Sequence, residues 1–332
     1  MFKNKLKIII LALILLAIIS RFLWLDKTAF FVSDQGRDMM VLHNIVINKS
    51  LTLIGPATSF AGNYGNIYFG PYYYYFLLPF YLLNNQPYFI TSIFPLLFIL
   101  GLILFFKIKE LKSYEKIIIS LLLISSSFSL YYTRFIWNLN LAFLLSFILF
   151  SIFLIYRKKI TVNGVLMLVF GIASGAIFQM HYAMFFLYIC LPIFFWKSWK
   201  NLLLYASGFI VSFFPFVLFD IRHSHVLSRN IYSLVVGMHP QIKTANFTFL
   251  QIFEKVFNYL LVPSINLYPL IKSLFMMGLY LFTIYFYIRQ KKILNHFIAL
   301  IFIVFLISFS IFKRDFDYYL ACFYIWFYIG AG

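Results

Sequence analysis

The sequence predicts an all-α polytopic membrane protein with about ten transmembrane helices. Hydrophobic residues make up 64% of the 332 residues, and only 11% are charged. The mean hydropathy is +0.93. Long uncharged segments recur along the chain. A soluble domain of this length could not cover so much apolar surface with so few charged side chains.

The first apolar segment, "IIILALILLAIIS", follows three lysines and has no small-residue cleavage site before Arg21 and Phe22. It therefore reads as an uncleaved first span rather than a secretory signal. Four further uncharged segments follow, at residues 88–106, 117–133, 141–156 and 165–180. Each is about long enough to cross a ~30 Å hydrocarbon core as a helix.

The basic residues predict the orientation of the spans. Fifteen of the 27 lysines and arginines fall in five short stretches that hold only two acids, Glu110 and Glu115. Basic loops face the cytoplasm, so the N-terminus is expected there, in a multi-pass protein of the inner or plasma membrane. The net charge of +18 then reflects these loops and predicts no nucleic-acid partner.

This orientation also places two apolar stretches, 70–87 and 246–268, in the outer interface rather than across the bilayer. The chain then forms one domain, 1–332, with long outer loops at 26–87 and 220–268. A last crossing at 317–332 is short, as is typical of an incomplete C-terminus. The two cysteines lie in apolar segments without a nearby partner, and predict neither a disulfide nor a metal site.

The first outer loop concentrates charge in the stretch "FVSDQGRDMMVLHNIV". Ser33 reads as a helix N-cap, with Asp34 in the first turn, where the helix dipole favours an acid. Asp34, Arg37 and Asp38 are three and four residues apart and share one helix face. Two interpretations stay open: a capped interfacial helix with a local ion pair, or a carboxylate that acts as general base toward a hydroxyl.

After the first span, an acidic motif comes first, followed by an amphipathic helix, a Gly/Pro-rich loop and the aromatic segment "GPYYYYFLLPF". This order of motifs resembles that of the GT-C integral-membrane glycosyltransferases. The closest branch is family 39, with the protein O-mannosyltransferases and aminoarabinose transferases; "LTLIGPATS", "FQMHYA" and "VLFDIRH" look like a bacterial subgroup of it. "YYTRFIWNLNL" resembles the second-outer-loop motif of the family, and "DQGRD" stands where the family usually has Asp-Glu followed by Tyr. The resemblance covers essentially the whole chain in order and hydropathy. It implies a GT-C-like domain whose first outer loop carries interfacial helices.

The resemblance implies an inverting transfer of a sugar from a polyprenyl-phosphate donor to a hydroxyl of a glycan, lipid or protein, on the extracytoplasmic face. Two departures matter. The second-loop acid of the family is replaced by an amide, at Asn138, and the lysine that often precedes the aromatic segment is replaced by Phe69 and Gly70. The first argues against a divalent metal shared between two acidic loops, and no cofactor is assigned.

The candidate site residues fall into three groups by expected role. The candidate bases are Asp34 and, as the second choice, Asp38; the candidate phosphate ligands are Arg37, Arg134 and Arg222. The candidate substrate contacts are Asn138, His181, Tyr182, His223, Tyr72 and Tyr73. Each has a structural alternative: a helix-start acid, a lipid-facing arginine at a span end, a buried histidine or an interfacial tyrosine belt.

Two other functions fit a polytopic chain with arginines in its outer loops. A polymerase or ligase of lipid-linked oligosaccharides usually has its large loop late in the chain, whereas here the first loop is the longest. A carrier or flippase for a lipid-linked sugar would keep moving its substrate after Asp34→Asn. The uncharged spans weaken that interpretation, since coupled carriers place charges near the bilayer midplane.

Overall fold

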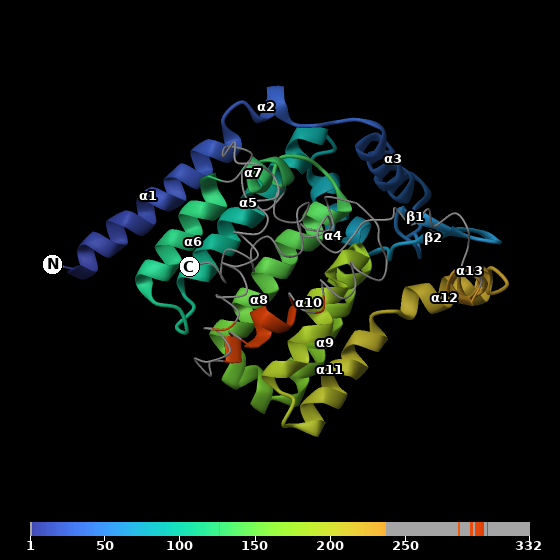
Figure 1. Cartoon of the computed structure of the whole chain (residues 1–332). Coiled ribbons are helices and arrows are strands. Elements are labelled where there is room, and N and C mark those ends of the chain that lie inside the picture. Colours follow the sequence, from blue (N-terminus) through green and yellow to red (C-terminus); the bar gives the residue numbers. More distant parts are fainter. Residues whose placement is uncertain are drawn as a thin grey trace, which may run out of the picture.

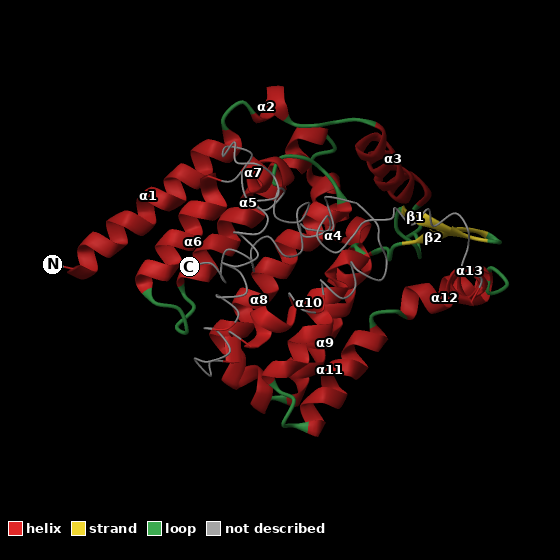
Figure 2. Ribbon diagram, viewed as in Figure 1, coloured by secondary structure: helices red, strands yellow, loops and turns green. Residues whose placement is uncertain are grey.

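The computed structural model describes residues 2–125 and 127–236, together with 285, 293, 294, 296–301 and 304. The described part is mostly helical (Figure 1, Figure 2). The α-helices are α1 (Phe2–Phe22), α2 (Leu25–Thr28), α3 (Ser33–Asn48), α4 (Tyr72–Leu83), α5 (Pro87–Phe106), α6 (Ser113–Ser125), α7 (Ser127–Tyr132), α8 (Asn138–Val162), α9 (Gly164–Met180), α10 (Phe185–Cys190), α11 (Trp199–Val211), α12 (Phe214–Arg222) and α13 (Val226–Val236). Two short 3₁₀ helices, η1 (Tyr182–Met184) and η2 (Leu191–Phe194), flank α10.

Two of the described helices, α5 and α8, are long and apolar enough to cross a membrane. A third span is formed if α11 and α12, which are bent by 41° at a short break, count as one crossing. The helices α5, α8 and α9 coincide with three of the predicted apolar segments. Of the roughly ten spans that the sequence predicts, the described residues therefore show two or three. Two predicted regions lie outside the described residues: residues 237–268 of the second outer loop, which include the predicted interfacial stretch 246–268, and the last crossing at 317–332.

The core is built where α9 packs between α8 and α11. Glycines let α9 and α11 approach closely: a Cβ on Gly171 would lie 2.3 Å from the Tyr205 carbonyl oxygen, and one on Gly208 would lie 2.2 Å from the Leu168 carbonyl oxygen. Phe153 of α8 stacks on Phe170 of α9 at 4.7 Å between ring centroids. Close backbone packing and stacked rings hold these helices as one block.

A buried arginine ties α1 to α6 and α7. Arg21 is fully buried and donates hydrogen bonds to the Leu123 and Ile124 carbonyl oxygens and to Ser129 Oγ, at 2.9–3.0 Å. Its guanidinium also lies 4.1 Å from the Phe98 ring centroid on α5. These donors and the ring contact hold α1 against α5 and α6.

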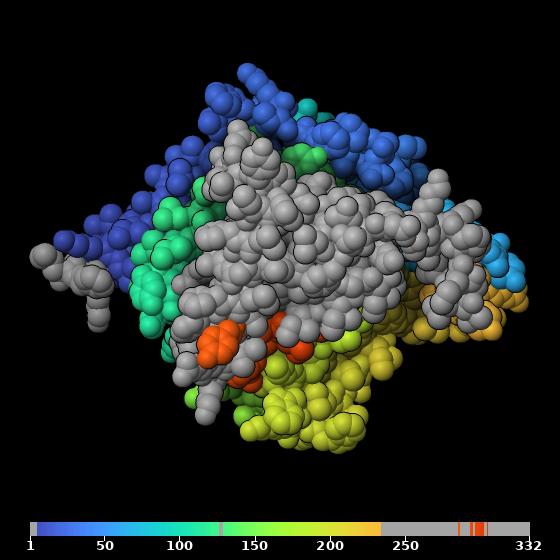
Figure 3. All heavy atoms as spheres, viewed as in Figure 1, coloured from blue at the N-terminus to red at the C-terminus, as the bar shows by residue number. Residues whose placement is uncertain are grey.

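The first outer loop contains a β-hairpin, so the prediction of an all-α protein needs correction. Strand β1 (Ala57–Gly62) pairs antiparallel with β2 (Gly65–Tyr68) in a two-stranded sheet. The two-residue turn Asn63–Tyr64 joins them, and Gly65 has φ 125°, which favours glycine. The hairpin rests on α13, and both lie at one edge of the molecule (Figure 3). The stretch "GNYGN" was the available sequence signal for this turn.

Candidate active site

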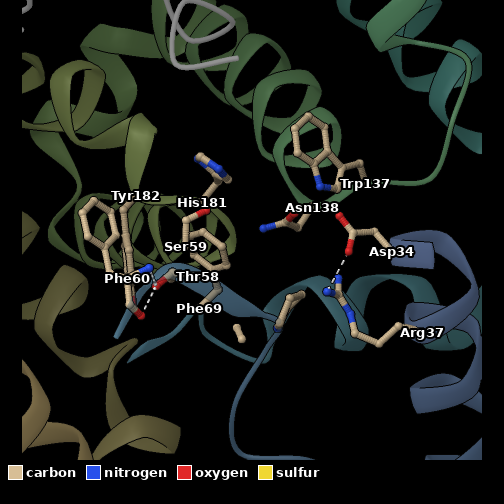
Figure 4. A pocket seen from close by; sticks show the side chains of 12 residues that line it. Asp34, Arg37, Thr58, Ser59, Phe60, Phe69, Trp137, Asn138, His181 and Tyr182 are labelled. Atoms are coloured by element: carbon tan, nitrogen blue, oxygen red, sulfur yellow. Dashed lines mark hydrogen bonds and ion pairs between the residues drawn. The ribbon is translucent and has the colours of Figure 1, made fainter. Parts of the chain in front are cut away.

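One cavity, of about 210 Å³, gathers much of the chemistry predicted from the sequence. Figure 4 shows its lining, with Asp34 and Arg37 on one side and the hairpin and His181 on the other. The lining residues come from α3, β1, the start of α8 and the break after α9: Asp34, Arg37, Pro56, Ala57, Thr58, Ser59, Phe60, Phe69, Trp137, Asn138, His181 and Tyr182. Segments up to 148 residues apart in the chain therefore meet at one site.

The charged side of the cavity is a guanidinium between two carboxylates. Arg37 Nη1 lies 3.0 Å from Asp34 Oδ1, and Arg37 Nη2 lies 2.8 Å from Asp38 Oδ1. The Asp34 side chain is 50% exposed, whereas that of Asp38 is 0% exposed. Burial alone would lower the pKa of the Arg37 guanidinium. The negative charges of Asp38 and then Asp34 outweigh this effect, so the pKa is raised. Asp34 therefore presents its carboxylate to the cavity, while Asp38 holds Arg37 from behind.

The helix α3 begins at Ser33 with Val32 as its N-cap, so the prediction of an N-cap at Ser33 is wrong by one residue. The Val32 N–H donates to Gln35 Oε1 at 3.0 Å. This side-chain cap satisfies a backbone group before the first turn and fixes the start of the helix. Because Asp34, Arg37 and Asp38 follow at helical spacing, the predicted shared face is present.

Helix α4 supplies the buried support for Asp38. The Tyr74 hydroxyl donates to Asp38 Oδ1 at 3.0 Å, and Tyr74 is almost fully buried. Burial raises the pKa of Asp38, opposed by the nearby Arg37 guanidinium and by hydrogen bonds from tyrosine hydroxyls. Tyr74 and Arg37 together therefore position a carboxylate that does not line the cavity.

The opposite wall forms where the chain breaks between α9 and η1. His181 is buried and stacks on Phe69 at 4.8 Å between ring centroids. Its Nδ1 accepts the Ala183 N–H at 3.2 Å, so the neutral ring carries its proton on Nε2. Burial lowers the pKa of His181 to about 3. The wall therefore presents a neutral imidazole, and Tyr182 beside it is fixed by donation to the Tyr68 carbonyl oxygen at 2.6 Å.

Asn138 lies at the start of α8 and joins the two walls. Its Nδ2 donates to the Met180 carbonyl oxygen at 2.7 Å, so the amide is anchored to the end of α9. Trp137 precedes it in the N-cap position and also lines the cavity. The predicted second-loop motif therefore reaches the same site as the first-loop acid.

Sequence reasoning did not identify the hairpin as part of the site. Residues 58–60 bulge between the paired positions Ala57 and Ala61 and line the cavity. Thr58 Oγ1 donates to the Phe60 carbonyl oxygen at 3.2 Å and accepts the Phe60 N–H at 3.1 Å, which fixes the bulge. Bulges commonly redirect side chains toward binding sites, and this one adds hydroxyl groups and an aromatic ring.

Several other predicted site residues lie away from the cavity lining. Arg134 Nη2 donates to the Leu23 carbonyl oxygen at 2.8 Å and to Thr28 Oγ1, so it fastens the turn after α1. Arg222 is exposed at the end of α12, and His223 stacks on Phe219 at 4.0 Å. The Tyr72 hydroxyl donates to the Ser212 carbonyl oxygen at 2.5 Å, and Tyr73 is fully buried.

The donor set of the cavity does not fit a divalent metal ion. Asp34 is the one carboxylate among the lining residues of this cavity, and Arg37 already pairs with it at 3.0 Å. No group of three or more His, Cys, Asp or Glu side chains that could hold a metal occurs among the described residues. A cation at Asp34 would have to displace the arginine, so no metal is assigned here.

No protein-family model and no curated protein sequence matches the chain. Among solved structures, the archaeal oligosaccharyltransferase AglB from Archaeoglobus fulgidus, in complex with an inhibitory peptide and a dolichol-phosphate, superposes with a TM-score of 0.60 at 13% identity. That match covers 99% of this chain and 50% of AglB. An oligosaccharyltransferase from the same organism in its apo form gives 0.59 at 13% identity, covering 98% and 50%.

These likenesses show the fold. The chain spans about half the length of the oligosaccharyltransferase structures that it matches. The shared architecture is a GT-C-like fold, and within it α5 and α8 are long and apolar enough to cross a membrane.

Proposed function

We propose that this protein is a membrane glycosyltransferase that moves a sugar from a polyprenyl-phosphate-linked donor to a hydroxyl acceptor. The proposal rests above all on one observation: Asp34 and Arg37 share one cavity with Asn138, His181 and Tyr182, in a chain with the fold of an oligosaccharyltransferase. Family 39, the extracytoplasmic location of the cavity and inversion at the sugar belong to this proposal. The dolichol-phosphate bound to AglB supports a lipid-phosphate donor by analogy.

In the proposed reaction, the acceptor oxygen bonds to the anomeric carbon as the bond from that carbon to the phosphate oxygen breaks. Asp34 accepts the hydroxyl proton, because its half-exposed carboxylate faces the cavity. The lipid phosphate leaves with the bonding electron pair, and Arg37 donates hydrogen bonds to its oxygens. The neutral His181, held by the Ala183 N–H, donates from Nε2 to the sugar or phosphate.

Arg37 can serve the phosphate because Asp38 fixes it from the side away from the cavity. The Nε and Nη2 atoms of Arg37 both donate to Asp38 Oδ1, at 3.0 and 2.8 Å. Nη1 points to Asp34 instead. When a phosphate arrives, Nη1 shifts from Asp34 to the phosphate, which leaves the Asp34 carboxylate able to accept the hydroxyl proton.

The decisive experiment incubates the purified full chain with radiolabelled polyprenyl-phosphate sugars and measures release of polyprenyl phosphate. Asp34→Asn should lower turnover by about 10²–10⁴-fold while donor binding persists, since general-base catalysis contributes this much. Asp26→Asn is the matched control: it removes an exposed acid of the same loop that does not line the cavity. Absence of polyprenyl phosphate with every donor, or an Asp34→Asn variant as active as Asp26→Asn, would contradict the proposal.

A further inference from the structure

A second cavity, of about 490 Å³, lies at the opposite end of α8 from the candidate active site. It is formed by the end of α8 and the turn that follows α5, and Figure 1 shows α8 crossing the middle of the molecule. Its lining residues are Lys109, Glu110, Leu154, Ile155, Tyr156, Arg157, Lys158 and Lys159. None of them takes part in the proposed transfer reaction.

The charge of this cavity is strongly positive. Four of its lining side chains are lysine or arginine, and Glu110 is the single acid among them. Glu110 Oε1 lies 3.8 Å from Arg157 Nη2, so the acid is already matched to one cation. Within the described part of the chain, Lys109, Lys158 and Lys159 make no ion pair. The cavity therefore lacks counter-charge and favours an anionic ligand.

Arg157 adds a donor that the protein does not satisfy. Its Nη1 is buried and makes no hydrogen bond to any described residue. The guanidinium lies 5.7 Å from the Phe194 ring centroid, which fixes its plane against the apolar core. A buried donor without an acceptor is costly, and a phosphate oxygen is an acceptor that suits a guanidinium.

The position along α8 identifies the source of the phosphate. Asn138 in the first cavity and Arg157 in the second are separated by 19 residues of one helix, or about 28 Å at ~1.5 Å per residue. This separation is close to the ~30 Å hydrocarbon thickness of a bilayer. The two cavities therefore lie at the headgroup levels of opposite leaflets.

The lining also has the apolar part that a lipid needs. The partly exposed Ile155 and the exposed Tyr156 continue the cavity wall from Arg157 toward the middle of α8, over the buried Leu154. An acyl chain that leaves the headgroup at Arg157 would follow this apolar side into the hydrocarbon core, while lysines stay at the interface.

We propose that this second cavity binds the headgroup of an anionic phospholipid from the leaflet opposite the candidate active site. The phosphate lies among Lys109, Arg157 and Lys158, and the acyl chains run along Ile155 and Tyr156. Bound in this way, the lipid joins the α5–α6 turn to α8.

The test uses the purified full chain in a neutral detergent. Native mass spectrometry measures retention of dioleoyl phosphatidylglycerol, with dioleoyl phosphatidylcholine as the zwitterionic comparison and glycerol 1-phosphate as a soluble competitor. The variant Lys109→Gln/Lys158→Gln removes two exposed lysines and leaves the Arg157–Glu110 pair intact. The matched control, Lys197→Gln/Lys200→Gln, removes two exposed lysines that do not line the cavity.

The wild-type chain should retain phosphatidylglycerol in preference to phosphatidylcholine. The cavity variant should weaken its apparent affinity by about fivefold per lysine, and the control variant should leave it unchanged. Equal retention of both lipids, or equal losses in the cavity and control variants, would overturn the proposal. Displacement by millimolar glycerol 1-phosphate would overturn the lipid assignment, because it would show a site for soluble phosphates.

Discussion

At the scale of single residues, the two carboxylates beside Arg37 have different physical characters. Asp34 is half exposed, so its ion pair at 3.0 Å is screened by water and contributes little to stability. Asp38 is fully buried, so its pair with Arg37 at 2.8 Å compensates a desolvated charge. The same arginine therefore has a half-exposed neighbour, the proposed base, on one side and a buried structural neighbour on the other.

Removing Arg37 should destabilise the protein through the buried Asp38 rather than through the half-exposed Asp34. Arg37→Gln leaves Asp38 buried without its cation, and we expect a loss of about 3–5 kcal/mol in the free energy of unfolding. Because burial raises the pKa of Asp38, the native state holds that proton more tightly than the unfolded chain. The contribution of Asp38 to stability is therefore greatest below its ordinary pKa of 3.8 and falls as pH rises through the raised value.

Denaturant titration of purified Arg37→Gln in detergent measures the loss in the free energy of unfolding. The double variant Arg37→Gln/Asp38→Asn should recover most of it, because no buried charge then remains at this position. A double variant as unstable as Arg37→Gln would show that Asp38 is not the cause.

His181 should make the protein sensitive to acid. Its folded-state pKa is about 3, below the ordinary 6.5, so the unfolded chain binds the proton first as pH falls. The stability contribution is fully present above pH 6.5 and is lost toward pH 3, by at most about 1.4 kcal/mol per pH unit. Unfolding midpoints at about pH 7.5 and about pH 5 should therefore differ less in His181→Asn than in the wild type. His223→Asn, at an exposed site, serves as control and should retain the full difference.

At the scale of elements, the hairpin depends on α13 for its position. Asn230 Oδ1 accepts the Tyr64 N–H at 2.8 Å, and Ser233 Oγ accepts the Asn63 N–H at 3.1 Å. Asp220 in turn caps α13 by accepting the Leu227 N–H at 2.7 Å. Since the bulge at residues 58–60 lines the candidate active site, α12 and α13 fix one wall of that site from outside it.

Two glycine substitutions test this coupling in opposite directions. A Cβ at Gly62 would lie 2.7 Å from the Asn230 Cα, so Gly62→Ala should push the hairpin off α13 and cost about 1–3 kcal/mol. A Cβ at Gly36, inside α3, would meet nothing within 4 Å, so Gly36→Ala should stabilise the chain by up to about 1 kcal/mol. Thermal unfolding in detergent compares the two, and equal effects of both substitutions would contradict the role of α13.

The sequence predicts elements well where the apolar segments are long. Residues 88–106, 141–156 and 165–180 become α5, α8 and α9, because a long apolar segment between polar turns favours a helix by length and hydropathy alone. The hairpin was read as a loop, since glycines at residues 62 and 65 interrupt its short strands. The roles of arginines in the outer loops are equally ambiguous: sequence alone does not separate Arg37, which lines the cavity, from Arg134, which fastens the turn after α1.

At the scale of the whole molecule, the spans bring distant motifs to a common level. Asp34 lies in the first turn of α3, Asn138 is the first residue of α8, and His181 directly follows α9. The three residues meet because these helix ends lie at the same side of the bundle. Sequence reasoning could predict this convergence from the topology alone. The contribution of the hairpin required tertiary information, because α13 lies more than 150 residues after the turn that it holds.

The position of α1 against this bundle should depend on Arg21. Its guanidinium is fully buried and holds the end of α6, whereas the partly exposed Arg134 holds the turn after α1 from outside. Arg21→Met removes hydrogen bonds to two backbone carbonyls and Ser129, and should cost about 3 kcal/mol or more. Arg134→Gln should cost less than about 1 kcal/mol, because its contacts are exposed to solvent. Titration of both variants with sodium dodecyl sulfate measures the difference, and Arg21→Lys should lie between them because one ammonium replaces the fork of donors. If Arg21→Met unfolded no earlier than Arg134→Gln, α1 would be held by apolar packing on α5 and α6 alone.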